Sequence, residues 1–198
     1  MANSARPFGL KAITNHGVCK FGRYWAPASL ASLGINTPVN LGGTSNSENT
    51  TNGQLTTAGS MPSIVVATGG TTNKLLGSIV GFEVLPTDLF KAGYNAALTA
   101  RIVYVADDVT QEFAIVDDGA GSLAITDVGL NANLSIGTVD PFTNIDSTSL
   151  NTATPAATVG FQLKILGLLD EPLNEVAAYA TWRVRINNHV LASNTAGV

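Results

Sequence analysis

The sequence of 198 residues has little charge and a single cysteine. Only 12% of its residues are Asp, Glu, Lys or Arg, whereas an average soluble domain carries about 25%. The ten Lys and Arg residues are scattered singly, so the chain lacks the basic patch that nucleic-acid binding requires. Because Cys19 has no second cysteine to pair with, no intrachain disulfide forms. We expect no DNA or RNA binding, and stability that comes from packing or assembly.

The sequence also lacks an apolar run long enough to span a bilayer, which takes about 18 residues or more. Its most apolar stretches are Leu75–Leu85 and Phe161–Leu169, and Glu83 and Lys164 interrupt them. The first residues are polar and show no apolar segment of a secretory signal. We therefore expect a soluble protein that is made in the cytoplasm and does not bind a membrane.

Residues that build metal centres and catalytic sites are scarce as well. His16 and Cys19 have the spacing of two metal ligands, but His189 is the only other histidine, so a full ligand set is missing. The chain has no Gly-x-Ser-x-Gly elbow and no glycine-rich phosphate loop. We expect no enzyme activity, no metal ion and no cofactor.

Five aspartates lie around one predicted hairpin, and two interpretations of them stay open. They are Asp107, Asp108, Asp117, Asp118 and Asp127. Carboxylates at strand ends can hold a calcium ion or act as paired acids in glycoside hydrolysis. Asp is also preferred in turns, because its side chain accepts hydrogen bonds from nearby backbone N–H groups. We favour the turn interpretation.

What the chain does have, from Met61 onward, is a series of short β-branched runs separated by turn residues. This pattern is typical of an all-β sandwich or barrel. The first forty residues carry several prolines and show no regular apolar period, which indicates an extended segment. We predict an all-β fold: a jelly-roll-like antiparallel β-sandwich with an extended N-terminal arm and long polar loops. Residues 1–20 would form the arm and residues 21–198 a single sandwich domain.

Two late strands show the clearest alternation of apolar and polar side chains, as expected for strands with one buried face. The apolar face of the second comprises Ala178, Ala180, Trp182, Val184 and Ile186, and the polar face comprises Tyr179, Thr181, Arg183, Arg185 and Asn187. The first strand, Phe161–Ile165, alternates likewise, with Gln162 and Lys164 on its polar face. We expect the two strands to pair antiparallel across a loop at Leu169–Val176.

Further elements follow from the same kind of pattern. Three more strands are predicted at Gly77–Leu85, Ala100–Ala106 and Gln111–Val116, and the turn after the last of them leads into a strand at Leu123–Thr126. A short helix is predicted at Thr87–Ala97. The segment Gly42–Ser60 is almost entirely Gly, Ser, Thr, Asn and Gln, so we expect a long loop that is mobile unless a partner holds it.

The N-terminal region combines aromatic residues with few charges, which is typical of contacts between chains. We predict the contact residues to be Arg6, Pro7, Phe8, Gly9, Leu10, Tyr24 and Trp25. The alternative is that Phe8, Tyr24 and Trp25 cap the domain's own core. Both interpretations stay open at this point.

Several stretches together point to a known family. They are Arg6–Leu10, Arg23–Ala28, Gly81–Glu83, Pro86–Leu89, Val103–Val105 before Asp107, Thr126–Asn133, Phe161–Leu166 and Trp182–His189. In number and order these segments resemble capsid cement (decoration) proteins of tailed bacteriophages. The segments Gly42–Ser60 and Val139–Ala156 have no counterpart in the resemblance.

The resemblance implies a jelly-roll-like structural virion protein on the outer surface of the capsid. Its partners would be the assembled major capsid protein, whose neighbouring capsomers it locks together, and itself, as a dimer or trimer. An alternative function is a surface-exposed carbohydrate- or receptor-binding module. In that case Tyr94, Phe142 and the acids from Asp107 to Asp118 would gather at one end of the fold.

Overall fold

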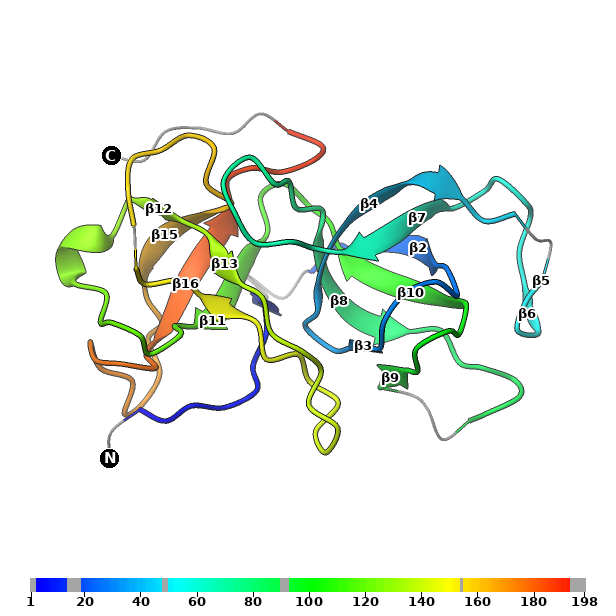
Figure 1. The fold of residues 1–198 in the computed structure, drawn as a ribbon, viewed down its shortest axis with the longest axis horizontal. Coiled ribbons are helices and arrows are strands. Elements are labelled where there is room, and N and C mark those ends of the chain that lie inside the picture. Colours follow the sequence, from blue (N-terminus) through cyan, green and yellow to red (C-terminus); the bar gives the residue numbers. More distant parts are fainter. Residues whose placement is uncertain (1–2, 14–18, 48–49, 90–92, 154, 193–198) are drawn as a thin grey trace.

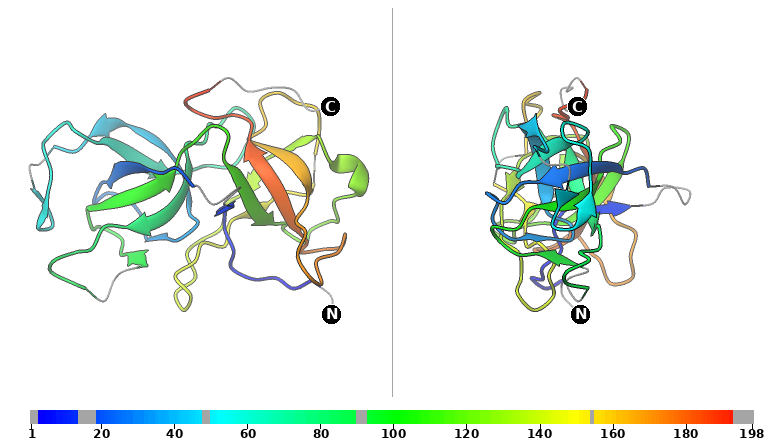
Figure 2. Two further views of the ribbon diagram at one scale, coloured as in Figure 1. Left: turned by 180° about the vertical axis from the view of Figure 1, so that it is seen from behind. Right: turned by 90° about the vertical axis from the view of Figure 1, so that its right-hand side faces the viewer.

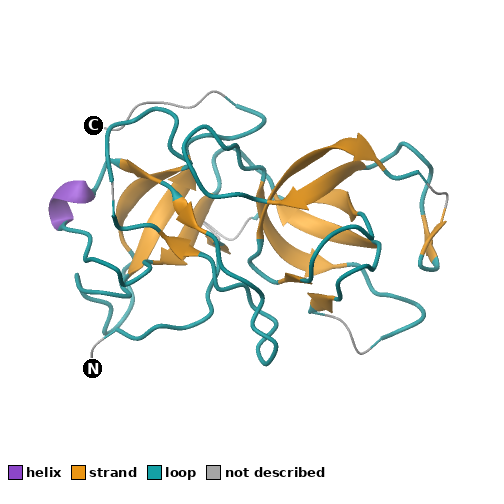
Figure 3. Cartoon of the chain, viewed as in Figure 1, coloured by secondary structure: helices purple, strands orange, loops and turns teal. Residues whose placement is uncertain are grey.

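The computed structural model describes residues 3–13, 19–47, 50–89, 93–153 and 155–192. Its strands are β1 (Lys11–Ile13), β2 (Gly22–Ala26), β3 (Leu33–Gly34), β4 (Pro38–Ser45), β5 (Thr50–Thr51), β6 (Gln54–Leu55), β7 (Pro62–Val66), β8 (Gly77–Phe82), β9 (Tyr94–Asn95), β10 (Arg101–Ala106), β11 (Glu112–Val116), β12 (Asn131–Ala132), β13 (Leu134–Ser135), β14 (Ser149–Leu150), β15 (Leu163–Leu168) and β16 (Thr181–Ile186). Within the described ranges a 3₁₀ turn, η1 (Ile125–Asp127), is the only helical element (Figure 3). The all-β prediction is confirmed.

The strands form two lobes that lie side by side (Figures 1 and 2). One lobe is a closed barrel in the order β10-β2-β7-β4-β8, and the other contains a five-stranded sheet in the order β1-β11-β16-β15-β12. Pairing is antiparallel except between β2 and β7, which meet in parallel at Trp25 and Ser63. The predicted antiparallel class is therefore confirmed, and this strand order does not establish the finer jelly-roll prediction.

Each lobe has its own hydrophobic core. Phe113, Ile115 and Trp182 are among the buried residues of the sheet lobe, and Ile64 and Val103 are among those of the barrel. The alternation predicted for β16 is confirmed from Trp182 to Ile186, because Trp182, Val184 and Ile186 are buried while Arg183 and Arg185 are exposed. Thr181 and Asn187, which were also predicted on the polar face, are buried instead. β15 and β16 pair antiparallel, as predicted.

One residue on the predicted polar face of β15's segment is buried instead. Gln162 is fully buried, and its side-chain oxygen accepts hydrogen bonds from the N–H groups of Gly70 and Leu134 at 3.2 and 3.1 Å. Its amide donates to the carbonyl of Thr68 at 2.8 Å. Such a side chain is stable inside because each of its polar atoms has a partner.

Two predicted elements are wrong. No helix forms in the described part of 87–97, where a turn follows Pro86 and β9 begins at Tyr94. Residues 123–126 form no strand, since η1 begins at Ile125. The backbone N–H of Ala124 donates a hydrogen bond to the Asp127 carboxylate at 2.8 Å. At 87–97 the pairing of β9 with β3 overrides the helical propensity, whereas at 123–126 the local Asp127 bond favours a 3₁₀ turn over a strand.

The N-terminal forty residues are more regular than predicted. They contain β1, β2, β3 and the start of β4, and β2 is a wall strand of the barrel. β1 lies inside the predicted arm and pairs with β11. Strands of two to five residues are too short to show a sustained apolar period, so the sequence pattern does not reveal them.

The polar segment 42–60 is also structured where it is described. β4 continues to Ser45, and β5 and β6 form a small hairpin. Asn46 is buried, and its side chain accepts from the N–H of Met61 at 2.9 Å and donates to the carbonyl of Thr57 at 2.8 Å. The prediction of a loop that needs a partner is therefore corrected: hydrogen bonds rather than apolar burial order this segment.

Candidate contact surfaces

The predicted contact residues of the arm divide into an exposed and an internal group. Arg6, Pro7 and Phe8 lie at least partly at the surface, whereas Gly9 and Leu10 are buried. Leu10 belongs to the core of the sheet lobe, and its N–H donates to the carbonyl of Asn36 at 2.9 Å. In this structure Gly9 and Leu10 are internal residues and present no surface to another chain, which corrects that part of the prediction.

Tyr24 and Trp25 point to opposite faces of β2. Tyr24 is buried in the barrel core, and its hydroxyl donates to the Asp107 carboxylate at 2.6 Å. Burial, with the hydrogen bond to Asp107, raises the pKa of Tyr24 well above its usual range. The sequence left open whether these residues contact another chain or cap the domain's own core. Tyr24 packs in the core, whereas Trp25 is only partly buried.

The exposed part of the arm borders two adjoining clefts of about 240 and 340 Å³. Both are lined by Arg6 and Tyr179. Arg6 donates to the Thr181 hydroxyl at 3.2 Å, and its guanidinium lies 5.1 Å from the centre of the Phe8 ring. Tyr179 has a left-handed backbone (φ 62°), and its N–H donates to Asp117 at 2.6 Å. These contacts hold the Arg6 side chain and the Tyr179 backbone at the junction of the two clefts.

The aspartates around the predicted hairpin act as turn residues. Asp117 is buried and accepts from the N–H groups of Gly119, Tyr179 and Ala180 and from the indole N–H of Trp182. Burial raises the pKa of Asp117, and these donors partly offset that effect. The Asp118 carboxylate accepts a hydrogen bond from the Thr152 hydroxyl at 2.6 Å. The Asp108 carboxylate accepts hydrogen bonds from the backbone N–H and the hydroxyl of Thr110.

The structure gives no metal geometry to the candidate ligands. Within the described ranges no group of three or more His, Cys, Asp or Glu side chains is placed to hold an ion. His16 lies outside these residues. Cys19 is half-buried with a raised pKa, caused first by burial and then by Asp107 and Asp108.

Two of the residues expected to gather in a carbohydrate- or receptor-binding module lie in different lobes. The Tyr94 hydroxyl donates to the Ser32 hydroxyl beside the barrel, whereas Asp117 follows β11 in the sheet lobe.

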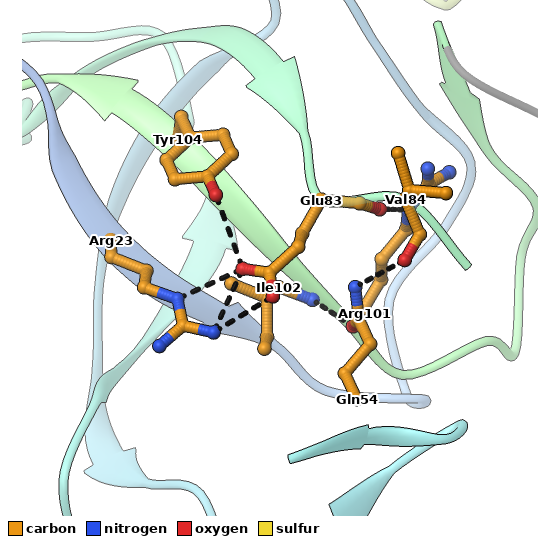
Figure 4. A network of polar contacts seen from close by, with 7 residues as sticks. All are labelled: Arg23, Gln54, Glu83, Val84, Arg101, Ile102 and Tyr104. Atoms are coloured by element: carbon orange, nitrogen blue, oxygen red, sulfur yellow. Dashed lines mark hydrogen bonds and ion pairs between the residues drawn. The ribbon is translucent and has the colours of Figure 1, made fainter. Parts of the chain in front are cut away.

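A polar network braces one end of the barrel (Figure 4). The Glu83 carboxylate accepts two hydrogen bonds from Arg23 at 2.9 Å each and one from the Tyr104 hydroxyl at 3.2 Å. Arg101 is buried and donates to the carbonyls of Glu83 and Tyr94 at 2.8 and 2.7 Å. Gln54 on β6 joins the network by donating to the carbonyl of Val84 at 3.0 Å. The loops at this end are therefore held together.

These braced loops display four large apolar side chains, which we call the barrel-end patch: Leu55, Val84, Leu89 and Leu98. Leu55 and Leu98 are 84% and 78% exposed. The Asn52 side chain in the β5–β6 hairpin donates to the carbonyl of Ala100, which links the hairpin to the segment that carries Leu98. Leu98 also has a left-handed backbone (φ 60°), a conformation that is costly for a leucine.

Sequence reasoning missed this patch, because its members come from three separate segments without a common period. The available signal is weak: large apolar residues inside polar, turn-rich stretches.

No family model, no curated protein and no solved structure matches the chain. Across the described ranges, no helix has the length and apolar character needed to cross a membrane.

Proposed function

We propose that the chain is a structural virion protein that binds the outside of the assembled capsid and stabilises contacts between capsomers, without catalysis. Its partners would be the major capsid protein and further copies of itself. The sequence resemblance to bacteriophage cement proteins suggests this role. The barrel-end patch is the structural observation that supports it most directly.

The patch supports a protein contact for a physical reason. Large exposed apolar side chains that gather on one surface usually mark an interaction site. Leu55 lies on β6 and Leu98 on the loop before β10. Hydrogen bonds of Asn52, Gln54 and Arg101 hold these segments, so little ordering cost is added on binding. Glu83, which precedes Val84, is already paired with Arg23. A preformed apolar surface of this kind suits a protein partner.

The mechanism would be stabilisation by mass action. A protein that binds the assembled shell but not its dissociated subunits shifts the equilibrium toward the shell. Because a shell offers many symmetry-related sites, a modest free energy at each site adds up over the particle. No covalent step is needed.

Co-sedimentation with empty heads of the bacteriophage that encodes the chain tests the proposal. The wild-type protein should pellet with the heads and saturate at a fixed number of copies. Leu98→Ser should weaken binding by about tenfold or more, since burying a leucine contributes about 1.5–3 kcal/mol.

Leu173→Ser is a matched control. Leu173 is also exposed (67%) and also has a left-handed backbone (φ 70°), but it lies in the sheet lobe. It should leave head binding unchanged. A wild-type protein that stays in the supernatant would overturn the function, whereas equal binding of both variants would overturn only the role of the patch.

Removing residues 1–20, the predicted arm, is not a suitable test of its role in binding. The truncation would delete β1 and Leu10, which belong to the fold of the sheet lobe. Loss of binding would then report unfolding. Phe8→Ser tests the exposed part of the arm without removing any strand.

The clefts around Arg6 and Tyr179 support a second candidate function, the binding of a carbohydrate or receptor at the surface. They combine a tyrosine ring, a guanidinium and the polar side chains of Asn3, Ser4 and Ser149. A glycan array would decide between the two functions. Glycan binding that Tyr179→Asn abolishes, in a wild-type protein that does not pellet with heads, would favour the second.

A further inference from the structure

A chemically labile dipeptide lies at the tip of the β5–β6 hairpin. Asn52 is followed by Gly53, and no other asparagine in the sequence is followed by glycine. Both residues are exposed, so water reaches them. Because glycine has no Cβ, no side chain shields its backbone nitrogen from the carboxamide of the preceding asparagine. Asn52 is therefore the asparagine of this chain that is best placed to react with its own backbone.

The hairpin presents this dipeptide as a two-residue turn. Thr51 pairs with Gln54, so only Asn52 and Gly53 lie between the two strands. Both have positive φ angles, 46° and 81°, which is the pattern of a type I′ turn. In such a turn the flanking residues make the hydrogen bonds between the strands. Strand pairing therefore does not engage the Gly53 nitrogen, which is the atom that would react.

The Asn52 side chain has a structural role that such a reaction would remove. Its amide donates to the carbonyl of Ala100 and so links the turn to the segment before β10. A separate anchor holds β6, because the Gln54 amide donates to the carbonyl of Val84 at 3.0 Å and the Gln54 oxygen accepts from the N–H of Ile102 at 3.2 Å. Loss of the Asn52 link would therefore free the turn while β6 stays attached.

We infer that Asn52 is a site of spontaneous deamidation, and that its conversion releases the β5–β6 turn from Ala100. The Gly53 nitrogen loses its proton to hydroxide and attacks Cγ of Asn52. The bond between Cγ and Nδ2 then breaks, and the nitrogen takes a proton from water and leaves as ammonia. The product is a cyclic succinimide, which water opens on one side to aspartate and on the other to isoaspartate. Overall, one water is consumed and one ammonia is released, with no oxidant, metal or cofactor.

Neither product can replace the asparagine. Both carry a carboxylate, which has no N–H to donate and places a negative charge beside the Ala100 carbonyl oxygen. Isoaspartate also inserts an additional carbon atom into the main chain, and a two-residue turn is too tight to absorb it without loosening the pairing of Thr51 with Gln54. Since the released ammonia is lost to solvent, the change runs in one direction and accumulates with the age of the molecule.

The same link joins the two segments that carry Leu55 and Leu98, so its loss also alters the barrel-end patch. The reaction itself requires only water and two adjacent residues of this chain. The inference therefore stands apart from capsid binding, and its tests use the isolated protein.

Peptide mapping by mass spectrometry of the full chain, incubated at neutral and at mildly alkaline pH, tests the reaction. The mass at Asn52 should increase by the difference between OH and NH₂, and faster at the higher pH because the Gly53 nitrogen must lose its proton. Asn46 is an internal reference, since it is buried and both polar atoms of its side chain are hydrogen-bonded. Asn52 should react at least about tenfold faster than Asn46, which corresponds to about 1.4 kcal/mol in barrier height.

Asn52→Gln is the matched variant for the cyclic route. It keeps a carboxamide donor, but its longer side chain would have to close a six-membered imide, which forms far more slowly. Residue 52 of this variant should keep its mass throughout the incubation. An Asn52 that reacts no faster than Asn46, or a glutamine that reacts as fast as Asn52, would overturn the assigned site and its chemistry.

Hydrogen exchange tests the structural consequence. Asn52→Asp carries one of the two products from the start. In this variant and in aged wild-type protein, the backbone N–H groups of Thr51 and Gln54 should exchange at least about tenfold faster than in fresh protein. The N–H of Ile102, which Gln54 holds, should keep its protection. Deamidation that leaves exchange at the turn unchanged would show that the Ala100 link does not hold the hairpin and would overturn that part of the inference.

Discussion

At the level of single residues, buried polar side chains define several of the loops. Asp117 accepts four hydrogen bonds and holds the backbone around Tyr179 in its left-handed turn. Asn46 joins the segments of Thr57 and Met61, and Gln162 joins those of Thr68, Gly70 and Leu134. Leaving any one of their partners unsatisfied costs about 1–3 kcal/mol. These residues are therefore expected to be intolerant of apolar substitution.

His189 makes the stability of the protein depend on pH. It is buried, with its Nδ1 accepting from the N–H of Leu191 at 3.0 Å. Burial lowers the pKa of His189, and Asp107 and Asp108 only partly oppose this effect. The unfolded chain, with an ordinary histidine pKa near about 6.5, therefore binds more protons below that pH than the folded chain. The free energy of unfolding should fall as the pH drops from about 7 toward 5, by about 1.4 kcal/mol for each unit of pKa lowering.

The matched variant is His189→Asn, which keeps a side-chain acceptor and removes the titration. Urea unfolding at a series of pH values should show a smaller loss of stability for this variant than for the wild type between pH values of about 7 and 5. The raised pKa of Asp117 acts in the opposite direction, but it does so in both proteins and cancels in their comparison. Parallel pH profiles for the two proteins would show that His189 does not control the effect.

At the level of elements, the arm is held to the barrel through one glycine. Gly9 has a left-handed backbone (φ 63°), and a Cβ there would lie 2.5 Å from the carbonyl oxygen of Asn36. Gly9→Ala should therefore destabilise the fold through both backbone strain and a clash, and should expose the arm to proteases. Gly43→Ala is the control, since Gly43 has the same kind of backbone (φ 75°) with open space around it. We expect Gly9→Ala to cost at least about 1 kcal/mol more than Gly43→Ala in urea unfolding. Equal costs would mean that packing against Asn36 does not hold the arm.

How well each element could be predicted depends on how its side chains are buried. From Trp182 to Ile186, β16 alternates between buried apolar and exposed charged side chains, so its alternation is visible in the sequence. β5 and β6 have two residues each and are held by side-chain hydrogen bonds of Asn52 and Gln54, which leave no periodic pattern. The segment 87–97 has local features of a helix, but pairing of β9 with β3 determines its conformation.

The candidate surfaces were harder to predict than the strands. Arg6 and Phe8 are contact candidates because an aromatic arm stands out in composition, and both lie at least partly at the surface, yet Leu10 of the same motif is internal. The barrel-end patch assembles Leu55 and Leu98 from distant loops, and only the folded chain shows that Asn52 joins those loops. Exposure of a loop residue depends on tertiary contacts that no local pattern encodes.

At the level of the whole molecule, the two lobes share structural elements. In β8, Ile79 belongs to the barrel core while the neighbouring Val80 packs against the core of the sheet lobe. The segment after β16 does the same, since Ile186 is in the sheet core and Val190 packs on the barrel core. The N–H of Val190 donates to the carbonyl of Leu75 at 2.8 Å. Neither core can open without exposing part of the other.

The two lobes should therefore unfold in a single cooperative transition. Each contains one of the two tryptophans, Trp25 in the barrel and Trp182 in the sheet lobe, so Trp182→Phe leaves a reporter that senses only the barrel. In that background, Ile115→Val in the sheet core should cost about 1 kcal/mol and shift the Trp25 fluorescence transition and the circular-dichroism transition to lower urea by the same amount. Ile79→Val in the barrel core is the matched control and should shift both signals equally. A circular-dichroism shift that leaves the Trp25 transition in place would show that the lobes unfold independently.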